Sequence, residues 1–231
     1  MTLGEGFSQL QAIYIRRPSP EYAQAFDQAV SRINQPDGAA LAVVSSPVHA
    51  VELLKRCTVP LAICGTGSFD AHTFVGQAEG WSQASLTSTD LRTEARQYSR
   101  MIWAEPEELC AVEMAHRMAA TAVIGATLDV IVSSSLRQSL PEWRTLPLPA
   151  ERPIRPDTVM EVLRAAGWQV EQPVALHGPR SMGWNLLARA ASIVGRPDWS
   201  DRCLSAMQTG YHEAGWLWPL AHLALIHAQL G

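Results

Sequence analysis

Apolar residues recur in the first third of the chain with two different spacings. In some segments they fall three and four residues apart, which is typical of an amphipathic helix. In others they form short uninterrupted runs, which are typical of strands buried on both faces. The spacing predicts strands at 11–16, 39–44 and 59–63 and helices at 20–34 and 48–56. This β-α-β-α-β order is the unit of a parallel sheet with right-handed crossovers.

The pattern is less regular in the rest of the chain, where a polar, loop-like stretch at 68–90 comes first. Helical spacing then returns, a fourth apolar run follows, and prolines cluster within 141–156. We predict helices at 91–103, 106–123 and 157–166, strands at 128–132 and 169–176, and broken helical segments over 181–231. Pro173 favours an edge position for the strand that contains it. The last apolar run, 220–230, fits a helix or a closing strand equally well.

These elements predict an α/β protein with a mainly parallel, Rossmann-like sheet of about five or six strands and helices on both faces. We expect residues 1–140 to form the α/β core and residues 141–156 to form a proline-rich strap or linker. Residues 157–231 would complete the sheet and add a tryptophan-rich, helical C-terminal extension.

Composition narrows the class of protein. The chain has 231 residues, of which 47% are hydrophobic, and a formal net charge of −4. The apolar content is too high for a disordered chain, and the acidic balance disfavours nucleic acid as a partner. No apolar run approaches the ~20 residues that span a bilayer, and four cysteines do not make a disulfide scaffold at this length. Because the N-terminal segment has no signal-peptide pattern, we expect a cytoplasmic protein with reduced cysteines.

Polar residues follow the predicted strands at the places where α/β proteins bind ligands, the carboxyl ends of the strands. Several of these exits lead to predicted helix starts, whose free N–H groups favour anions, and arginine can hold an anion through two hydrogen bonds. The same residue types also serve ordinary strand-to-helix turns. The candidate ligand-binding residues are Ser45, Ser46, His49, Gly65, Thr66, Gly67, Ser68, Ser133, Arg137, His177 and Arg180.

The densest group of reactive side chains lies between residues 64 and 72, where Cys64, Asp70 and His72 are the catalytic candidates. A cysteine nucleophile needs a nearby base, which His72 or His49 would provide across the loop. Cys64 would otherwise be a small buried core residue, as most free cysteines are. Asp90 and Asp129 are further candidate bases, and Asp129 would otherwise be a turn residue.

The motifs of common nucleotide and metal sites are missing from the sequence. The glycines at 65 and 67 have the spacing of neither GxGxxG nor GxxxxGK[ST], and the single lysine, Lys55, follows no glycine loop. No CxxC or HExxH occurs, and His222 and His227 do not share a helical face. We therefore expect no P-loop and no metal site, and the residues identify no cofactor.

Tryptophan is concentrated near the C-terminus, in a region with few charges. Six of the eight tryptophans are Trp143, Trp168, Trp184, Trp199, Trp216 and Trp218. This region must cover its apolar faces, either against the protein's own sheet or against a partner. The sequence is compatible with either a different protein partner or a second copy of the chain in a homodimer.

Residues 157–176, the helical insertion after them and the closing apolar run 220–228 resemble the C-terminal part of class I SAM-dependent methyltransferases. In that family a helix that ends in Ala-Gly-aromatic leads to a strand, and a final antiparallel strand closes the sheet. The resemblance covers the last third of the chain. It implies binding of S-adenosylmethionine (SAM) at a glycine-rich loop after an early strand, where this chain has Ser45-Ser46-Pro47 and Gly65-Thr66-Gly67.

The sequence leaves three functional hypotheses. The first is an intracellular protein that binds a small anionic or nucleotide-like ligand at the strand ends, as a transferase or a hydrolase. The second is a non-catalytic, degenerate α/β subunit that regulates or scaffolds a protein partner. The third is a SAM-dependent methyltransferase-like protein. Whether the chain is an enzyme is therefore open at this point.

Overall fold

A computed structural model of the chain describes residues 20–35, 38–78, 84–133, 154–175, 179–209 and 223–231. Its helices are α2 (Pro20–Ile33), α3 (Pro47–Leu54), α4 (Ala71–Gln77), α5 (Ala111–Ala120), α7 (Pro156–Ala165), α8 (Pro179–Ile193) and α9 (Pro197–Thr209). Its strands are β1 (Ala40–Val44), β2 (Leu61–Gly65), β3 (Leu86–Ser88), β4 (Tyr98–Ala104), β5 (Ala122–Ser133), β6 (Trp168–Val170), β7 (Val174–Ala175) and β8 (Leu223–Leu230).

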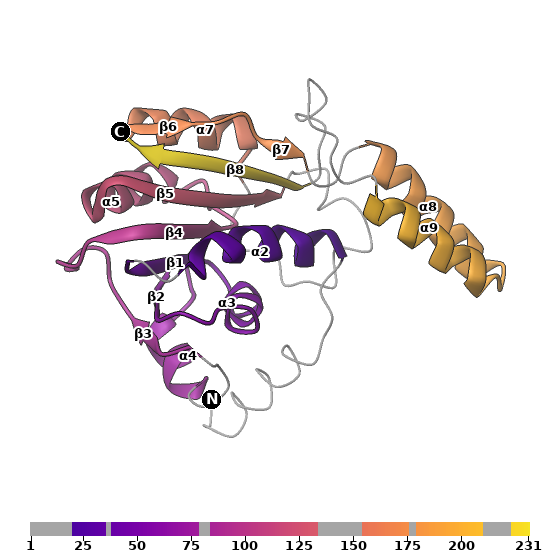
Figure 1. Cartoon of the computed structure of the whole chain (residues 1–231), viewed down its shortest axis with the longest axis horizontal. Helices are drawn as coiled ribbons and strands as arrows, with labels where there is room; N and C mark the ends of the chain where they lie inside the picture. Colours follow the sequence, from indigo (N-terminus) through magenta and orange to yellow (C-terminus); the bar gives the residue numbers. More distant parts are fainter. Residues whose placement is uncertain (1–19, 36–37, 79–83, 134–153, 176–178, 210–222) are drawn as a thin grey trace.

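The strands form one sheet in the order β3-β2-β1-β4-β5-β8-β6, with β7 also paired to β8 (Figure 1). Strands β1 to β5 are parallel to their neighbours, and β8 runs antiparallel to β5, β6 and β7. This confirms the predicted α/β fold with a mainly parallel sheet. Because the parallel strands point the same way, their carboxyl ends lie along a single edge.

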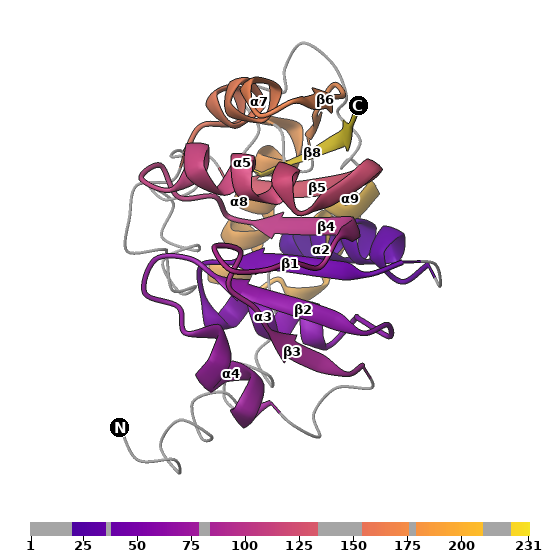
Figure 2. The same ribbon diagram turned by 90° about the vertical axis from the view of Figure 1, so that its left-hand side faces the viewer.

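Helices cover both faces of the sheet, as Figures 1 and 2 show. Successive side chains of a strand point to opposite faces, so each strand contributes to two cores. Ala40, Ala42 and Val44 of β1 join the core formed with α2, α3 and α4. Leu41 and Val43 join the core formed with α5 and α7. This alternation determines on which side of the sheet each functional side chain lies.

Several sequence predictions are confirmed by the structure. Helices predicted at 20–34, 48–56 and 157–166 correspond to α2, α3 and α7, and strands predicted at 39–44 and 59–63 correspond to β1 and β2. The last apolar run is the closing strand β8, and Pro173 lies between the short strands β6 and β7 at the sheet edge. The predicted strand at 11–16 and the strap up to residue 153 lie outside the described residues.

The prediction between residues 68 and 103 was wrong. The stretch 68–90 contains α4 and β3, and the helix predicted at 91–103 is a loop followed by β4. Leu91, Ala95, Tyr98 and Ile102 fall three and four residues apart, which imitated a helical face. The helix predicted at 106–123 is the shorter α5, after which β5 begins at Ala122. The sheet consequently has eight strands among the described residues, more than the five or six expected.

Asp129, a candidate base, lies within β5 and is almost completely buried. Its carboxylate accepts a hydrogen bond from Arg32 of α2 (2.8 Å) and lies 3.1 Å from Nδ1 of His227, its partner in register on β8. These contacts connect α2 to the sheet. Asp129 is not among the residues that line the pockets described below.

Helices α8 and α9 pack against each other and project away from the sheet (Figure 1). They follow β7 and precede β8, so the chain leaves the sheet and returns to it around this hairpin. Among the described residues, no helix combines the length and the apolar character needed to cross a bilayer.

Candidate functional site

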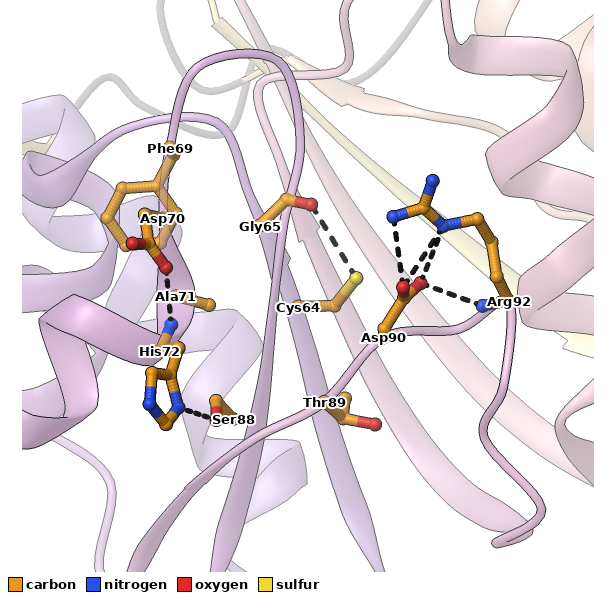
Figure 3. Close-up of a pocket in the computed structure, with 10 residues that line it drawn as sticks. All are labelled: Cys64, Gly65, Phe69, Asp70, Ala71, His72, Ser88, Thr89, Asp90 and Arg92. Atoms are coloured by element: carbon orange, nitrogen blue, oxygen red, sulfur yellow. Dashed lines mark hydrogen bonds and ion pairs between the residues drawn. The ribbon is translucent and has the colours of Figure 1, made fainter.

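Two adjoining pockets lie where β2 and β3 end, with cavity volumes of about 320 Å³ and 240 Å³. Both are lined by Cys64, Gly65, Asp90 and Arg92. The first pocket, shown in Figure 3, is also lined by Phe69, Asp70, Ala71, His72, Ser88 and Thr89. The second is also lined by Thr66, Gly67, Leu91, Cys110, Glu113, Met114 and Arg117. The shared residues make them one continuous candidate site.

The loop after β2 needs its two glycines for different reasons. A Cβ at position 65 would lie 2.1 Å from the carbonyl oxygen of Phe69, so the tight turn leaves no room for a side chain. Gly67 has a φ of +59°, and a Cβ there would lie 2.6 Å from a carboxylate oxygen of Glu107. The path of this loop, which lines the pockets, therefore requires glycine at both positions.

Asp90, two residues beyond β3, supplies the carboxylate that both pockets share. It accepts hydrogen bonds from the backbone N–H of Arg92 (2.9 Å) and from the side-chain Nε of Arg92 (3.0 Å) (Figure 3). These hydrogen bonds lower the pKa of Asp90 below its ordinary value. Asp90 is thus a charged acceptor at neutral pH, and its side chain remains partly exposed to a ligand.

The loop that carries Asp90 is held by a second polar cluster. Glu94 accepts hydrogen bonds from the hydroxyl of Thr89, from the hydroxyl of Tyr98 (3.1 Å) and from the backbone N–H of Arg96 (2.8 Å). Tyr98 is buried at the start of β4, so the loop is tied to the sheet at both ends. The position of Asp90 is therefore fixed by the fold.

The Tyr98 cluster predicts a specific dependence of stability on alkaline pH. Burial, followed by the hydrogen bond to Glu94, raises the pKa of Tyr98 to about 12 from 10.0. A raised folded-state pKa contributes stability that is present below pH 10 and is lost as the pH rises toward 12. Because the tyrosine ionises more easily in the unfolded state, the free energy of unfolding should fall by up to about 2–3 kcal/mol between pH 10 and pH 12. Urea unfolding of the wild type and of Tyr98→Phe between pH 9 and pH 12 measures it.

The two proteins should converge as the pH rises, because the variant lacks the titrating hydroxyl. Absorbance at 295 nm gives an independent check, since the wild type should contain one late-titrating tyrosine that Tyr98→Phe lacks. Parallel stability curves over the whole interval would contradict the assigned role of Tyr98.

The opposite wall of the first pocket is formed by the start of α4. Asp70 is the N-cap of this helix and accepts hydrogen bonds from the backbone N–H groups of His72 (3.0 Å) and Thr73 (3.2 Å). The Thr73 hydroxyl also donates to it, which is the main reason that the pKa of Asp70 is lowered. Nδ1 of His72 lies 3.3 Å from the Ser88 hydroxyl. Asp70 and His72 thus line the pocket as parts of a helix start.

Cys64 and His72 lie on opposite sides of β2. Cys64 belongs to the core under α5 and α7, whereas Ala71 and Phe74, on the same helix as His72, belong to the core under α2 and α3. Figure 3 shows the thiol pointing toward Asp90 and the imidazole pointing toward Ser88. Burial also raises the pKa of the Cys64 thiol, which disfavours the thiolate. This geometry favours Cys64 as a lining residue over Cys64 as a nucleophile activated by His72.

The exit of β1 carries Ser45, Ser46 and His49, and all three are buried beside the pockets without lining them. The Ser45 hydroxyl donates to the carbonyl oxygen of Glu105 (3.3 Å) and lies 3.5 Å from Nδ1 of His49. Ser46 is the N-cap residue of α3, but its side chain does not cap the helix. Its hydroxyl is buried and has no hydrogen-bond partner in the structure as described.

The remaining sequence candidates divide into two groups. Thr66 and Gly67 line the second pocket, and Ser68 is exposed in the same loop. Arg137 and His177 lie outside the described residues, as do the side chains of Ser133 and Arg180. Their predicted roles at the site stay predictions.

Sequence reasoning missed most of the β3 side of the site. Ser88, Thr89 and Arg92 were not among its candidates, because their segment was taken as loop and helix. It also missed Cys110, Glu113 and Arg117 of the α5 region, which line the second pocket. A polar Ser-Thr-Asp sequence directly after Leu86-Thr87 was the available signal, since it marks the exit of a short strand.

The exit of β4 adds two buried carboxylates, Glu105 and Glu107. Glu105 has a φ of +55°, a left-handed conformation that is uncommon for residues other than glycine. Glu107 lies against Gly67, and its carboxylate is 4.0 Å from the Cys110 thiol. Neither glutamate lines the two pockets.

Sequence comparison identifies no relative: no protein-family model and no curated protein matches the chain. Solved structures do match. Magnesium protoporphyrin IX methyltransferase (ChlM) from Synechocystis PCC 6803 with bound SAH is 11% identical, with a TM-score of 0.54 over 98% of this chain and 95% of that chain. The N-methyltransferase NodS from Bradyrhizobium japonicum WM9, in complex with S-adenosyl-L-homocysteine (SAH), is 12% identical, with a TM-score of 0.50 over 97% of each chain.

The chain has the fold of the class I SAM-dependent methyltransferases. This confirms the resemblance noted in its last third and extends the likeness to most of the chain. The [4+2]-cyclase SpnF has a similar structure, with 12% identity and a TM-score of 0.50 over 90% of this chain and 80% of that chain. At such identities the likeness establishes the fold, and the reaction must be argued from the site.

Proposed function

We propose that the chain is a SAM-dependent transferase that binds the nucleoside part of its cofactor across the two pockets at the ends of β2 and β3. The observation that carries the proposal is that the Asp90 carboxylate and the glycine loop 65–67 line the same pocket at this edge of a methyltransferase-type sheet. S-adenosylmethionine, when bound, supplies an electrophilic methyl group on a sulfonium centre. The residues of this chain would bind and orient it.

The lining residues fit a nucleoside. A carboxylate is purely an acceptor, and the two neighbouring hydroxyls of a ribose are donors that Asp90 could accept. Arg92 forms an ion pair with Asp90, but the Arg92 side chain is 69% exposed and can move into solvent at little cost. Phe69 and Leu91 add apolar surface near the same carboxylate, as a base ring requires.

The β1 exit supports binding of the polar end of the same ligand. Val44 is paired in register with Gly65, so Ser46 lies close to the glycine loop. The uncapped N-terminus of α3 and the unpartnered Ser46 hydroxyl offer polar groups that a carboxylate could satisfy. Both halves of the ligand would then lie along one edge of the sheet.

The test is binding of SAH to the full chain, by thermal shift and calorimetry. SAH at 100 times its Kd should stabilise the fold by about 2.7 kcal/mol, a rise in Tm of roughly 5–11 °C. ATP and NAD at the same concentration serve as controls for nucleotides in general. No shift with saturating SAH would refute the proposal, and an equal shift with ATP would assign the pocket to nucleotides of another class.

A second candidate is a degenerate subunit that binds the nucleoside without catalysis. Buried serines follow β1 where a glycine loop would be expected, which favours this reading. Methyl transfer from radiolabelled SAM to acceptors in a cell extract separates the two. Binding of SAH with transfer to some acceptor supports the transferase, and binding without transfer to any acceptor supports the degenerate subunit.

A further inference from the structure

The α8–α9 hairpin carries apolar side chains on the face that its own packing does not use. Ala188 and Ala191 are on the buried side of α8, which packs against α9. Leu186 and Ile193 are seven residues apart, as are Leu187 and Val194, which follows the last residue of α8, so the two pairs lie along another side of the helix. All four side chains are exposed. We call these four residues the α8 stripe.

Exposure of the apolar residues increases toward the turn of the hairpin, the end that Figure 1 shows farthest from the sheet. Trp184, near the start of α8, is 36% exposed, Leu186 is 59% exposed, and Ile193 at the end of the helix is 85% exposed. Trp199 in the first turns of α9 is also exposed. Ile193, Val194 and Trp199 therefore form an apolar tip at the turn, beside the exposed charged residues Arg196 and Asp198.

The hairpin is basic within an acidic protein. Residues 179–209 contain four arginines and two aspartates, a net charge of +2, whereas the whole chain has a net charge of −4. Arg196 lies in the turn between Val194 and Trp199, and Arg189 and Arg202 lie on the two helices. Arginine and tryptophan beside apolar side chains are typical of elements that lie at the interface between lipid and water.

We propose that the α8–α9 hairpin binds an anionic lipid surface, with Ile193, Val194 and Trp199 entering the interface and Arg196, in the same turn, meeting the lipid headgroups. A projecting apolar tip can enter a fluid lipid surface, because such a surface does not need a pocket of matching shape. Pairing with a second copy through the α8 stripe would bury the middle of the helix, whereas the greatest exposure is at its end. The hairpin would thus hold the protein on the membrane from one side, as a peripheral element.

Flotation of the full chain with vesicles tests the proposal. The chain should bind vesicles of phosphatidylcholine mixed with phosphatidylglycerol and bind pure phosphatidylcholine much more weakly, and added salt should reduce the binding. The double variant Ile193→Ser, Val194→Ser should weaken partitioning by about tenfold or more. Lipids brominated on their acyl chains should quench a part of the tryptophan fluorescence that is lost in Trp199→Phe.

The matched control is Ile124→Ser. Ile124 lies on β5 and is 88% exposed. The substitution therefore removes a similar apolar side chain from outside the hairpin. It should bind vesicles like the wild type, and circular dichroism should show all variants folded. Absence of vesicle binding by the wild type, or unchanged binding by the double variant, would overturn the proposal. A wild-type dimer in light scattering that the double variant converts to a monomer, without vesicle binding, would assign the stripe to a second copy instead.

Discussion

Replacing Trp103 by alanine should lower the free energy of unfolding by about 3–5 kcal/mol, which is among the largest losses expected from a single substitution in this chain. Trp103 lies in the centre of the sheet, paired in register with Val43 of β1 and Val130 of β5. Its side chain is buried in the core under α5 and α7. Removal of the indole leaves a cavity that neighbouring strands cannot close, because their backbone is fixed by the sheet. Urea unfolding at neutral pH measures the loss.

The control is Trp103→Phe at the same site. The indole N–H of Trp103 is buried and lacks an acceptor in the described part of the chain. Replacement by phenylalanine therefore removes no hydrogen bond and leaves a smaller cavity than replacement by alanine. We expect it to lower the free energy of unfolding by about 1–2 kcal/mol. Equal losses for the two variants would show that the indole N–H has a partner after all. A loss below about 1 kcal/mol for alanine would contradict the central position of Trp103 in the core.

The parts of the fold that could be predicted from the sequence are those with a continuous pattern. β1 and β2 are runs of apolar residues because both of their faces are covered by helices. α2 and α7 each bury one face and leave the other in solvent, so their apolar residues follow the helical repeat. The glycine loop at 65–67 could be placed at the edge of the sheet because it directly follows such a run.

The β3 side of the site could not be predicted in the same way. β3 has three residues, of which none is fully buried, so it carries no alternation long enough to identify a strand. Without β3, the exit with Thr89 and Asp90 had no assigned place. The separation of Cys64 from His72 was equally hidden, because the face on which a strand residue lies depends on register, and a shift of one residue reverses it.

The site and the hairpin belong to different parts of the sheet, and this separation lets their roles be tested independently. The pockets lie at β2 and β3, near one end of the strand order, whereas α8 and α9 connect β7 to β8 near the other end. Variants of the tip should therefore leave SAH binding unchanged, and variants of Asp90 should leave vesicle binding unchanged. Each proposal can then fail without the other.

Asp90→Asn should weaken binding of SAH by about 10- to 100-fold, because a hydrogen bond to a charged acceptor contributes roughly 1.5–3 kcal/mol. Asparagine keeps the size of the side chain and removes its charge, so the pocket should retain its shape. Arg92→Ala should not weaken binding, since it removes the group that competes for Asp90. Calorimetric titration of the wild type and both variants measures these changes.

The matched control is Asp157→Asn. Asp157 forms an ion pair with Arg155 (2.9 Å), two residues away on the chain, just as Asp90 does with Arg92. Asp157 lies at the start of α7 and does not line the pockets. Its affinity for SAH should equal that of the wild type. If Asp90→Asn binds as tightly as the wild type, the nucleoside does not lie at the β3 exit. If Arg92→Ala loses affinity together with Asp90→Asn, the arginine itself holds the ligand, and the pocket selects an anion in place of a ribose.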